Sequence, residues 1–254
     1  MARNCTFNGT DLSSLTGITI LDIKSNSIPA RKLHQAELAE ADGGILTNAF
    51  YGPKSILVTG VIEGTDANQA EGYRDTLLTY LSEPNASLIF EQAGTNRVYT
   101  ATMQDAVFSD DNVGGHIPFD IRFLCNDPFG YSQNQLQTTD LGVTTSGDTT
   151  AVTNSGTYKI YPIIWIHLNS FTGSNDQTIV VTIGSSSLSI TRTWTAGETI
   201  YIDGINKTVL VGSTAVNYTG LFPVLEVGSN TVTVTDTFSA RNIDKTIKYT
   251  YRYL

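Results

Sequence analysis

The chain has 254 residues, of which 15% are charged, and its formal net charge is −9. The acidic excess lies in residues 1–130, which hold 8 Lys and Arg against 16 Asp and Glu, whereas the remainder holds 7 against 8. Because a surface that binds nucleic acid needs clustered basic side chains, this distribution argues against stable nucleic-acid binding. The length suits one large β domain or two domains of ordinary size, and two is the commoner solution.

The N-terminal segment "MARNCTFNGTDLSS" has no apolar run of roughly 7 to 15 residues, as a signal peptide would. No run elsewhere approaches the roughly 18 apolar residues that span a bilayer, so we expect no membrane segment. Synthesis in a cytoplasm is the simplest expectation, and the two cysteines, Cys5 and Cys125, are expected to be reduced thiols.

Residues 17–64 are predicted to form a strand, a protruding insertion and a second strand, in that order. Residues 17–25 and 54–64 are rich in branched side chains in alternation with other residues, which is typical of strands. Between them, residues 31–52 form a long insertion that mixes charged and apolar side chains around the turn signal Asp42-Gly43-Gly44.

A helix is predicted from Asp66 to the residues before Pro84, because the apolar period changes there. Asp66 is the expected N-cap, with Gln69 completing a capping box. The expected buried face of this helix comprises Ala70, Tyr73, Leu77 and Leu81.

Alternating strands follow at 86–92, 96–110 and 116–127. In the last of them Cys125 lies in line with Phe123, on the apolar side of the strand. Cys125 is therefore predicted to be a buried structural side chain, and the turn beginning at Asp127-Pro128 to close the first domain.

Residues 132–155 are mainly Thr, Ser, Gln and Gly, which indicates a linker, although "TTAVT" is compatible with a short edge strand. Short strand-like segments without a helical period then continue to the C-terminus, which indicates an all-β sandwich or jelly roll. We expect one domain at 1–133 and a second at 134–254.

No residue pattern predicts catalysis or metal binding. The histidines, His34, His116 and His167, do not lie in a motif that would present a base to Cys125. The chain lacks closely spaced zinc-ligand pairs, and "GVIEGTDANQ" lacks the lysine of a phosphate loop. We therefore expect no cofactor and no enzyme, although a carboxylate pair of a small hydrolase cannot be picked out among 24 Asp and Glu.

A candidate for glycan binding is the strand "WIHLNSF", where Trp165, His167 and Asn169 share one face. The His-x-Asn spacing is similar to that of galectins, but Ser170 stands near the position of the arginine that follows their motif. A packed strand face is the alternative.

Several segments in sequence order carry a resemblance to a known family. They include "DGGILTNAFYGPKSILVTGVIEG", "YRDTLLTYL", "NRVYTATM" and "FDIRFLCNDPFGYS" in the first half, and "NSGTYKIYPIIWIHL", "GETIYIDG", "GLFPVLEVGSNTV" and "IKYTYRYL" in the second. Together they resemble the distal tail protein (Dit) family of bacteriophages with long non-contractile tails, over nearly the whole chain.

The resemblance implies a mainly β protein: an N-terminal β-sandwich or split barrel with one packed helix, related to tail tube proteins, and a C-terminal galectin-like jelly roll. It also implies a non-enzymatic virion protein at the tail tip. Six copies would form a hexameric ring around a DNA channel and join the tail tube protein to the tail-tip proteins. A carbohydrate-binding module that contacts the host surface is the alternative function.

The insertion at 31–52 is the candidate subunit-interface loop of such a homo-oligomer, because it carries apolar side chains that a neighbouring subunit would cover. These are Leu33, Leu38, Ile45, Leu46 and Phe50. A lone solvated loop is the alternative.

Overall fold

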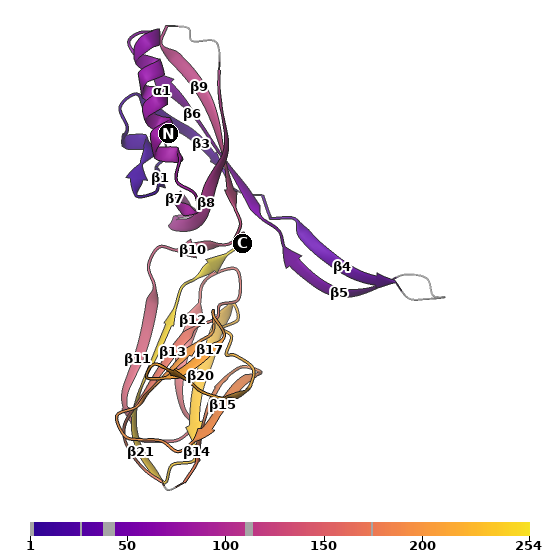
Figure 1. Cartoon of the computed structure of the whole chain (residues 1–254), viewed down its shortest axis with the longest axis vertical. Helices are drawn as coiled ribbons and strands as arrows, with labels where there is room; N and C mark the ends of the chain where they lie inside the picture. The colour runs from indigo at the N-terminus through magenta and orange to yellow at the C-terminus, as the bar shows by residue number, and fades with distance from the viewer. Residues whose placement is uncertain (1–2, 26, 38–43, 110–113, 174) are drawn as a thin grey trace. The chain divides into compact units, whose positions relative to one another are not determined.

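The computed structural model describes residues 3–25, 27–37, 44–109, 114–173 and 175–254. Contacts divide the chain into two compact units, Met1–Gln133 with Leu254 (unit 1) and Asn134–Tyr253 (unit 2). Both are built from antiparallel strands, and α1 is the only α-helix in the described residues (Figure 1). The mainly β architecture with one packed helix is confirmed.

Unit 1 contains a sheet of antiparallel strands in the order β2-β1-β7-β8-β9-β6-β3, with β10 pairing to β8. The short 3-10 helix η1 (Leu12–Ser14) follows β2. Apart from the hairpin of β4 (Arg31–Glu37) and β5 (Gly44–Tyr51), the strands of this unit are β1 (Cys5–Phe7), β2 (Thr10–Asp11), β3 (Ile18–Lys24), β6 (Lys54–Glu63), β7 (Ala86–Gln92), β8 (Thr95–Phe108), β9 (His116–Cys125) and β10 (Gly130–Ser132).

The long strand β8 belongs to both halves of this sheet. Its first part pairs with β7 up to Ala101, and its second part pairs with β9 from Thr102 to Phe108. The two halves enclose one core, in which the rings of Phe7 on β1 and Phe123 on β9 lie 5.0 Å apart. This arrangement follows from the alternating burial along β9, where every second residue from Ile117 to Cys125 is buried.

The helix α1 (Ala67–Leu81) packs beside β6 and β9 (Figure 1). Asp66 caps it by accepting a hydrogen bond from the Gln69 backbone N–H at 2.9 Å, while the Gln69 side chain accepts from the N–H of Thr65 at 2.7 Å. Ala70, Leu77 and Leu81 are buried, as predicted, and the ring of Tyr73 is partly buried against the same core.

Unit 2 has two antiparallel sheets, in the orders β11-β21-β13-β16-β17-β18 and β12-β20-β14-β15-β19. The bounds of the strands of the first sheet are β11 (Leu136–Val143), β13 (Ile163–Thr172), β16 (Thr199–Asp203), β17 (Thr208–Val211), β18 (Thr214–Ala215) and β21 (Ala240–Tyr249). Those of the second are β12 (Asp148–Asn154), β14 (Gln177–Ile183), β15 (Ser186–Arg192), β19 (Thr219–Gly220) and β20 (Gly228–Asp236). The short strand β22 (Arg252–Tyr253) follows β21 and belongs to neither of these two sheets.

The two sheets of unit 2 share a single apolar core. Ile164 and Ile166 of β13 belong to the same buried cluster as Val181 of β14 and Leu188 of β15. Because alternate residues of each strand face this cluster, the unit is a β-sandwich.

The prediction of a linker at 132–155 is wrong, whereas its alternative, a short edge strand at "TTAVT", corresponds to β12 at the edge of its sheet. These residues form β11, which pairs with β21, and β12, which pairs with β20, so they contribute one strand to each sheet of the sandwich. Their many threonines are β-branched residues on strands with one exposed face, which is why the composition looks polar.

No helix in the described part of the chain is long and apolar enough to cross a membrane.

Candidate functional site

The insertion at 31–52 forms a β-hairpin, which we call the arm, from β4 (Arg31–Glu37) and β5 (Gly44–Tyr51). Among the described residues, these two strands pair only with each other (Figure 1). The register shifts between His34 and Gln35, where the Thr47 hydroxyl donates a hydrogen bond to the His34 carbonyl at 2.9 Å. The predicted turn residues Asp42 and Gly43 lie outside the described residues.

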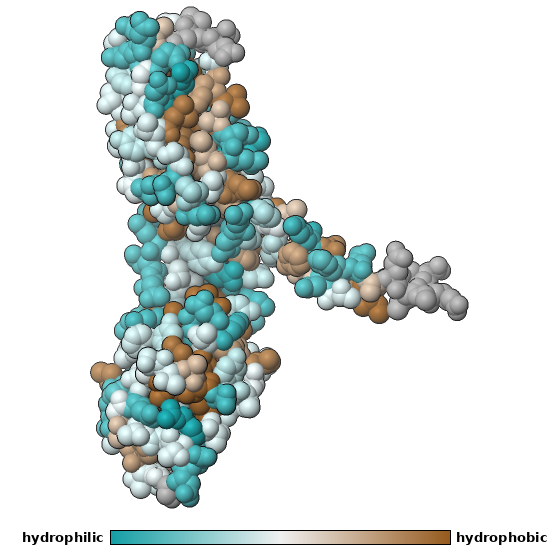
Figure 2. All heavy atoms as spheres, viewed as in Figure 1, coloured by the Kyte–Doolittle hydropathy of each residue, from teal (hydrophilic) through white to brown (hydrophobic). Residues whose placement is uncertain are grey.

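The arm exposes large apolar side chains, and Figure 2 shows apolar residues along it among hydrophilic ones. Leu33 and Leu46 are each 54% exposed, Ile45 is 53% exposed and Phe50 is 43% exposed. The fifth predicted interface residue, Leu38, lies outside the described residues.

These side chains occupy both faces of the arm. Leu33 is paired with Ala49, whereas Phe50 is paired with Lys32 on the opposite face, where its ring stacks on His34 at 5.2 Å. A two-stranded hairpin is only marginally stable by itself in water. A second surface that covers the apolar side chains would therefore stabilise the arm.

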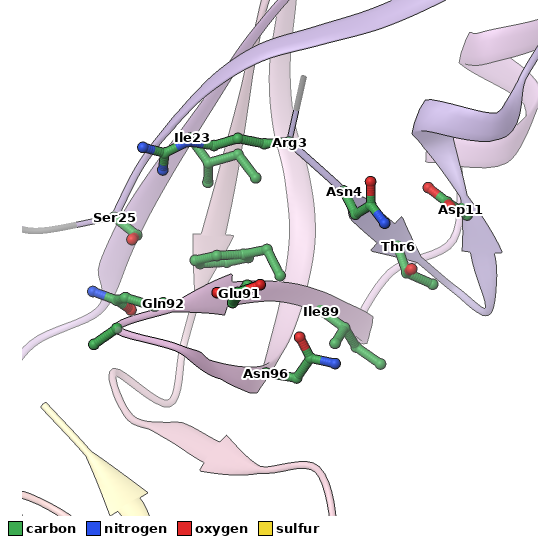
Figure 3. A pocket seen from close by; sticks show the side chains of 12 residues that line it. Arg3, Asn4, Thr6, Asp11, Ile23, Ser25, Ile89, Glu91, Gln92 and Asn96 are labelled. Carbon is green, nitrogen blue, oxygen red and sulfur yellow. The ribbon is translucent and has the colours of Figure 1, made fainter. Parts of the chain in front are cut away.

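A separate hollow of about 900 Å³ lies on unit 1 beside β1, the end of β3 and the turn after β7 (Figure 3). Figure 3 shows side chains from these elements around it, including Arg3, Ile23, Ser25 and Gln92.

Several polar groups of the hollow take part in local structural bonds. Arg3 pairs with Asp22 at 3.7 Å, and Asp11 caps the 3-10 helix by accepting from the Ser13 N–H at 3.0 Å. Gln92 accepts a hydrogen bond from the Tyr99 hydroxyl at 3.2 Å. The hollow is consequently a polar concavity of the fold, and none of these bonds forms a nucleophile–base pair.

The candidate glycan-binding residues lie on β13 of unit 2. The Trp165 side chain is 42% exposed, and its ring packs in a T-shaped arrangement with that of Tyr201, with the ring centroids 5.7 Å apart. The Lys248 ammonium lies 4.6 Å from the centre of the same indole ring, which sequence reasoning did not anticipate. This cation occupies a position over the aromatic face that a stacked sugar would need.

The other two candidates on this strand are engaged with neighbouring side chains. The Nδ1 atom of His167 is 2.8 Å from the Thr199 hydroxyl, and Asn169 donates to the side chain of Asn242 at 3.1 Å. The register of β13 against β21 shifts between Leu168 and Ser170, so Asn169 lies at an irregularity of the strand.

The cysteines are free and fully buried, as predicted for Cys125. Burial raises the pKa of both thiols to about 12, with Asp11 adding to the effect at Cys5. At Cys125 the nearby Lys54 opposes this rise without cancelling it. Since the thiolate is the nucleophile, neither side chain is suited to covalent catalysis.

In the part of the chain that the structure describes, no group of three or more His, Cys, Asp and Glu side chains could hold a metal ion.

The comparisons with known proteins agree with this architecture at the level of fold. The crystal structure of the Dit protein of phage SPP1 matches with a TM-score of 0.72 over 100% of both chains, at 16% sequence identity. The chain has the fold of a phage Dit protein. The SPP1 protein is described as a paradigm of the hub adsorption apparatus in phages that infect Gram-positive bacteria.

Two structures of the phage P2 baseplate also align with this chain, but more weakly. The calcium form covers 98% of this chain and 98% of its own at 10% identity, with a TM-score of 0.42. The strontium form covers 97% and 98% at 8% identity, with a TM-score of 0.43. No protein-family model and no curated protein matches the sequence.

Within the Dit-like fold, the structure brings Leu33, Ile45, Leu46 and Phe50 together on one hairpin. It places Trp165 and His167 on one strand but surrounds the indole with Lys248 and Tyr201. Long-range pairing across β13, β16 and β21 creates this cluster, so no local signal in "WIHLNSF" could have revealed it.

Proposed function

We propose that this chain is a structural hub of a phage tail, one that forms a homo-oligomeric ring at the distal end of the tail tube. The observation that carries the proposal is the TM-score of 0.72 to the SPP1 Dit hub protein over the full length of both chains. In this role the protein acts by geometry and buried area, and no catalytic step is required.

The arm is the proposed contact between neighbouring protomers. A closed ring needs two different surfaces on each protomer, so that the projection of one meets a receiving surface on the next. The exposed Leu33, Leu46 and Phe50 supply apolar area that such a contact would remove from water. The ring contact would also stabilise the hairpin, whose strands pair only with each other within the described residues.

We propose six copies in the ring, with the tail tube protein on one side and the tail-tip proteins on the other. Residues 1–130 carry 16 acidic against 8 basic side chains, which suits a channel that passes DNA without retaining it. The protein would be made in the host cytoplasm and act in the virion tail tip.

The test is the assembly state of the purified chain, measured by light scattering and by negative-stain imaging, alone and with its neighbouring tail proteins. We expect rings whose mass is six times that of the protomer. A monomer that forms no ring at high concentration, alone or with those proteins, would overturn the hub proposal.

Variants of the arm test the proposed contact. Leu33→Ser combined with Leu46→Ser should weaken ring formation by at least about tenfold, because truncating central interface side chains costs about 1 to 2 kcal/mol each. The matched control is Leu141→Ser, which removes a leucine that is 73% exposed on β11 of unit 2. Rings of unchanged stability in the double variant would place the contact elsewhere.

Carbohydrate binding is a second candidate because the Trp165 side chain is 42% exposed. A sugar would have to displace the Lys248 ammonium from the indole ring. Glycan-array binding that disappears in Trp165→Ala and persists in Trp194→Phe, a change at a buried tryptophan, would support it. The absence of any glycan binding by the wild-type protein would count against it.

A further inference from the structure

Lys245 is a lysine inside the core of unit 2. It lies on β21, and its side chain is 0% exposed. Its neighbours on the same side of the strand, Ile243 and Ile247, are buried, as is Ile166, its register partner on β13. An ammonium group in such a position needs specific partners, because burying an unpaired charge is very costly.

Two aspartates converge on the Lys245 amine. The Nζ atom lies 2.6 Å from Oδ2 of Asp148 and 3.3 Å from Oδ2 of Asp140, and it also contacts the Asp148 backbone carbonyl at 3.2 Å. The Thr150 hydroxyl donates a short hydrogen bond to the same oxygen of Asp140.

The three side chains come from three strands and from both sheets. Asp140 on β11 is the direct register partner of Lys245, within one sheet. Asp148 begins β12, which belongs to the other sheet. The contact between Lys245 and Asp148 therefore bridges the two layers of the sandwich.

The carboxylates meet solvent although the lysine does not. The Asp140 and Asp148 side chains are 34% and 39% exposed, and they line an open hollow of about 380 Å³. The Lys245 amine is therefore held in contact with the Asp148 carboxyl group, with the Asp140 carboxyl group beside it. The adjoining open hollow gives a released water molecule a path to solvent.

We propose that Lys245 and Asp148 form an intramolecular isopeptide bond, with Asp140 as the acid–base catalyst. Proton transfer from the ammonium to the Asp148 carboxylate gives an amine and a carboxylic acid in contact. The lone pair of Nζ then attacks Cγ of Asp148, the carbon that carries the Oδ2 atom lying 2.6 Å from Nζ.

Asp140 completes the reaction by moving one proton. It accepts a proton from Nζ in the tetrahedral intermediate and delivers it to the departing hydroxyl group of Asp148. The Cγ–O bond breaks, the Cγ–N amide bond remains, and one water molecule leaves. Asp140 ends as the carboxylate it was at the start, and no oxidant or other reactant is needed.

The bond would tie β12 covalently to β21, across the sandwich. A cross-link between residues so far apart in sequence restricts the unfolded chain strongly and resists separation of the sheets. The proposal does not depend on the hub function, because it concerns the chemistry of one unit.

Mass spectrometry of the full-length protein tests the proposal directly. We expect the denatured protein to be lighter than its sequence mass by one water molecule. We also expect trypsin to release residues 123–159 joined to residues 242–248 as one branched peptide, uncleaved after Lys245. If the protein has its full sequence mass and releases these two segments as separate, unmodified peptides, the proposal is overturned, whatever result the variants give.

Three variants assign the roles. Lys245→Arg and Asp140→Asn should each give a protein with the full mass of its own sequence and should abolish the branched peptide. The matched control, Lys248→Arg, changes a lysine three residues further along the same strand and should leave the branched peptide intact. A branched peptide that persists in Asp140→Asn would remove Asp140 from the reaction, and one that persists in Lys245→Arg would show a different cross-link.

Discussion

Asp203 illustrates how a single buried carboxylate organises a turn. It accepts hydrogen bonds from the backbone N–H groups of Ile205 and Asn206, from the Asn206 side chain and from the Tyr201 hydroxyl. Burial works against ionisation, but these donors outweigh it and hold the pKa of Asp203 below its ordinary value of 3.8.

The lowered pKa of Asp203 determines the direction in which its contribution to the free energy of unfolding changes with pH. Ionised Asp203 stabilises the fold above its unfolded pKa, and this contribution is lost as the pH falls through the folded pKa. Asp203→Asn should therefore lower the free energy of unfolding by about 1 to 2 kcal/mol at neutral pH. Urea denaturation should show the difference from wild type narrowing below pH 3.8. The exposed Asp176→Asn serves as control, and an equal loss there would contradict the assignment.

Cys5 and Cys125 should be inert in the folded protein. Their thiols are 0% exposed and their pKa values are raised to about 12, so both access and thiolate formation are suppressed. Titration with a thiol reagent at pH 8 should detect no fast-reacting thiol in native protein and two after denaturation. Rapid labelling of either residue in the native state would contradict this.

At the scale of elements, the N-terminal cap of α1 is a testable source of stability. Asp66→Ala removes the acceptor for the Gln69 N–H and should lower the free energy of unfolding of unit 1 by about 1 kcal/mol. The control, Asp75→Ala, removes a helix carboxylate whose side chain is 71% exposed. If thermal denaturation shows a larger loss of stability for Asp75→Ala than for Asp66→Ala, the capping role is refuted.

Elements were predictable where a local period or cap specifies them. The helix from 67 to 81 carries its own apolar period and its own cap, and β9 carries strict alternation. Residues 136–154 have no aromatic residue and no long apolar run. Their strand structure depends instead on pairing with β21 and β20. The inward position of Lys245 was readable from its two-residue spacing to Ile247, but a lysine contradicts the rule that strand positions in a core are apolar.

At the scale of the whole molecule, the order of motifs predicted the fold better than any single site. The resemblance rested on segments spread over both halves, and the full-length match to the SPP1 Dit protein agrees with it. The sites depend on contacts that the sequence does not display. Lys248 on β21 reaches Trp165 on the adjacent strand β13. The exposure of the arm follows from the absence of a third strand beside β4 and β5 in the described residues.

The two units are also expected to behave as separate folding domains, because each has its own core. The buried cluster of unit 1 runs from Cys5 to Cys125, and that of unit 2 runs from Val152 to Ile247. Segments 1–133 and 134–254, expressed separately, should each give a cooperative unfolding transition by circular dichroism. If the arm closes the ring, only segment 1–133 should self-associate in light scattering, and Leu33→Ser with Leu46→Ser should reduce that association. Self-association confined to segment 134–254 would move the ring contact to the sandwich, because that segment lacks the arm.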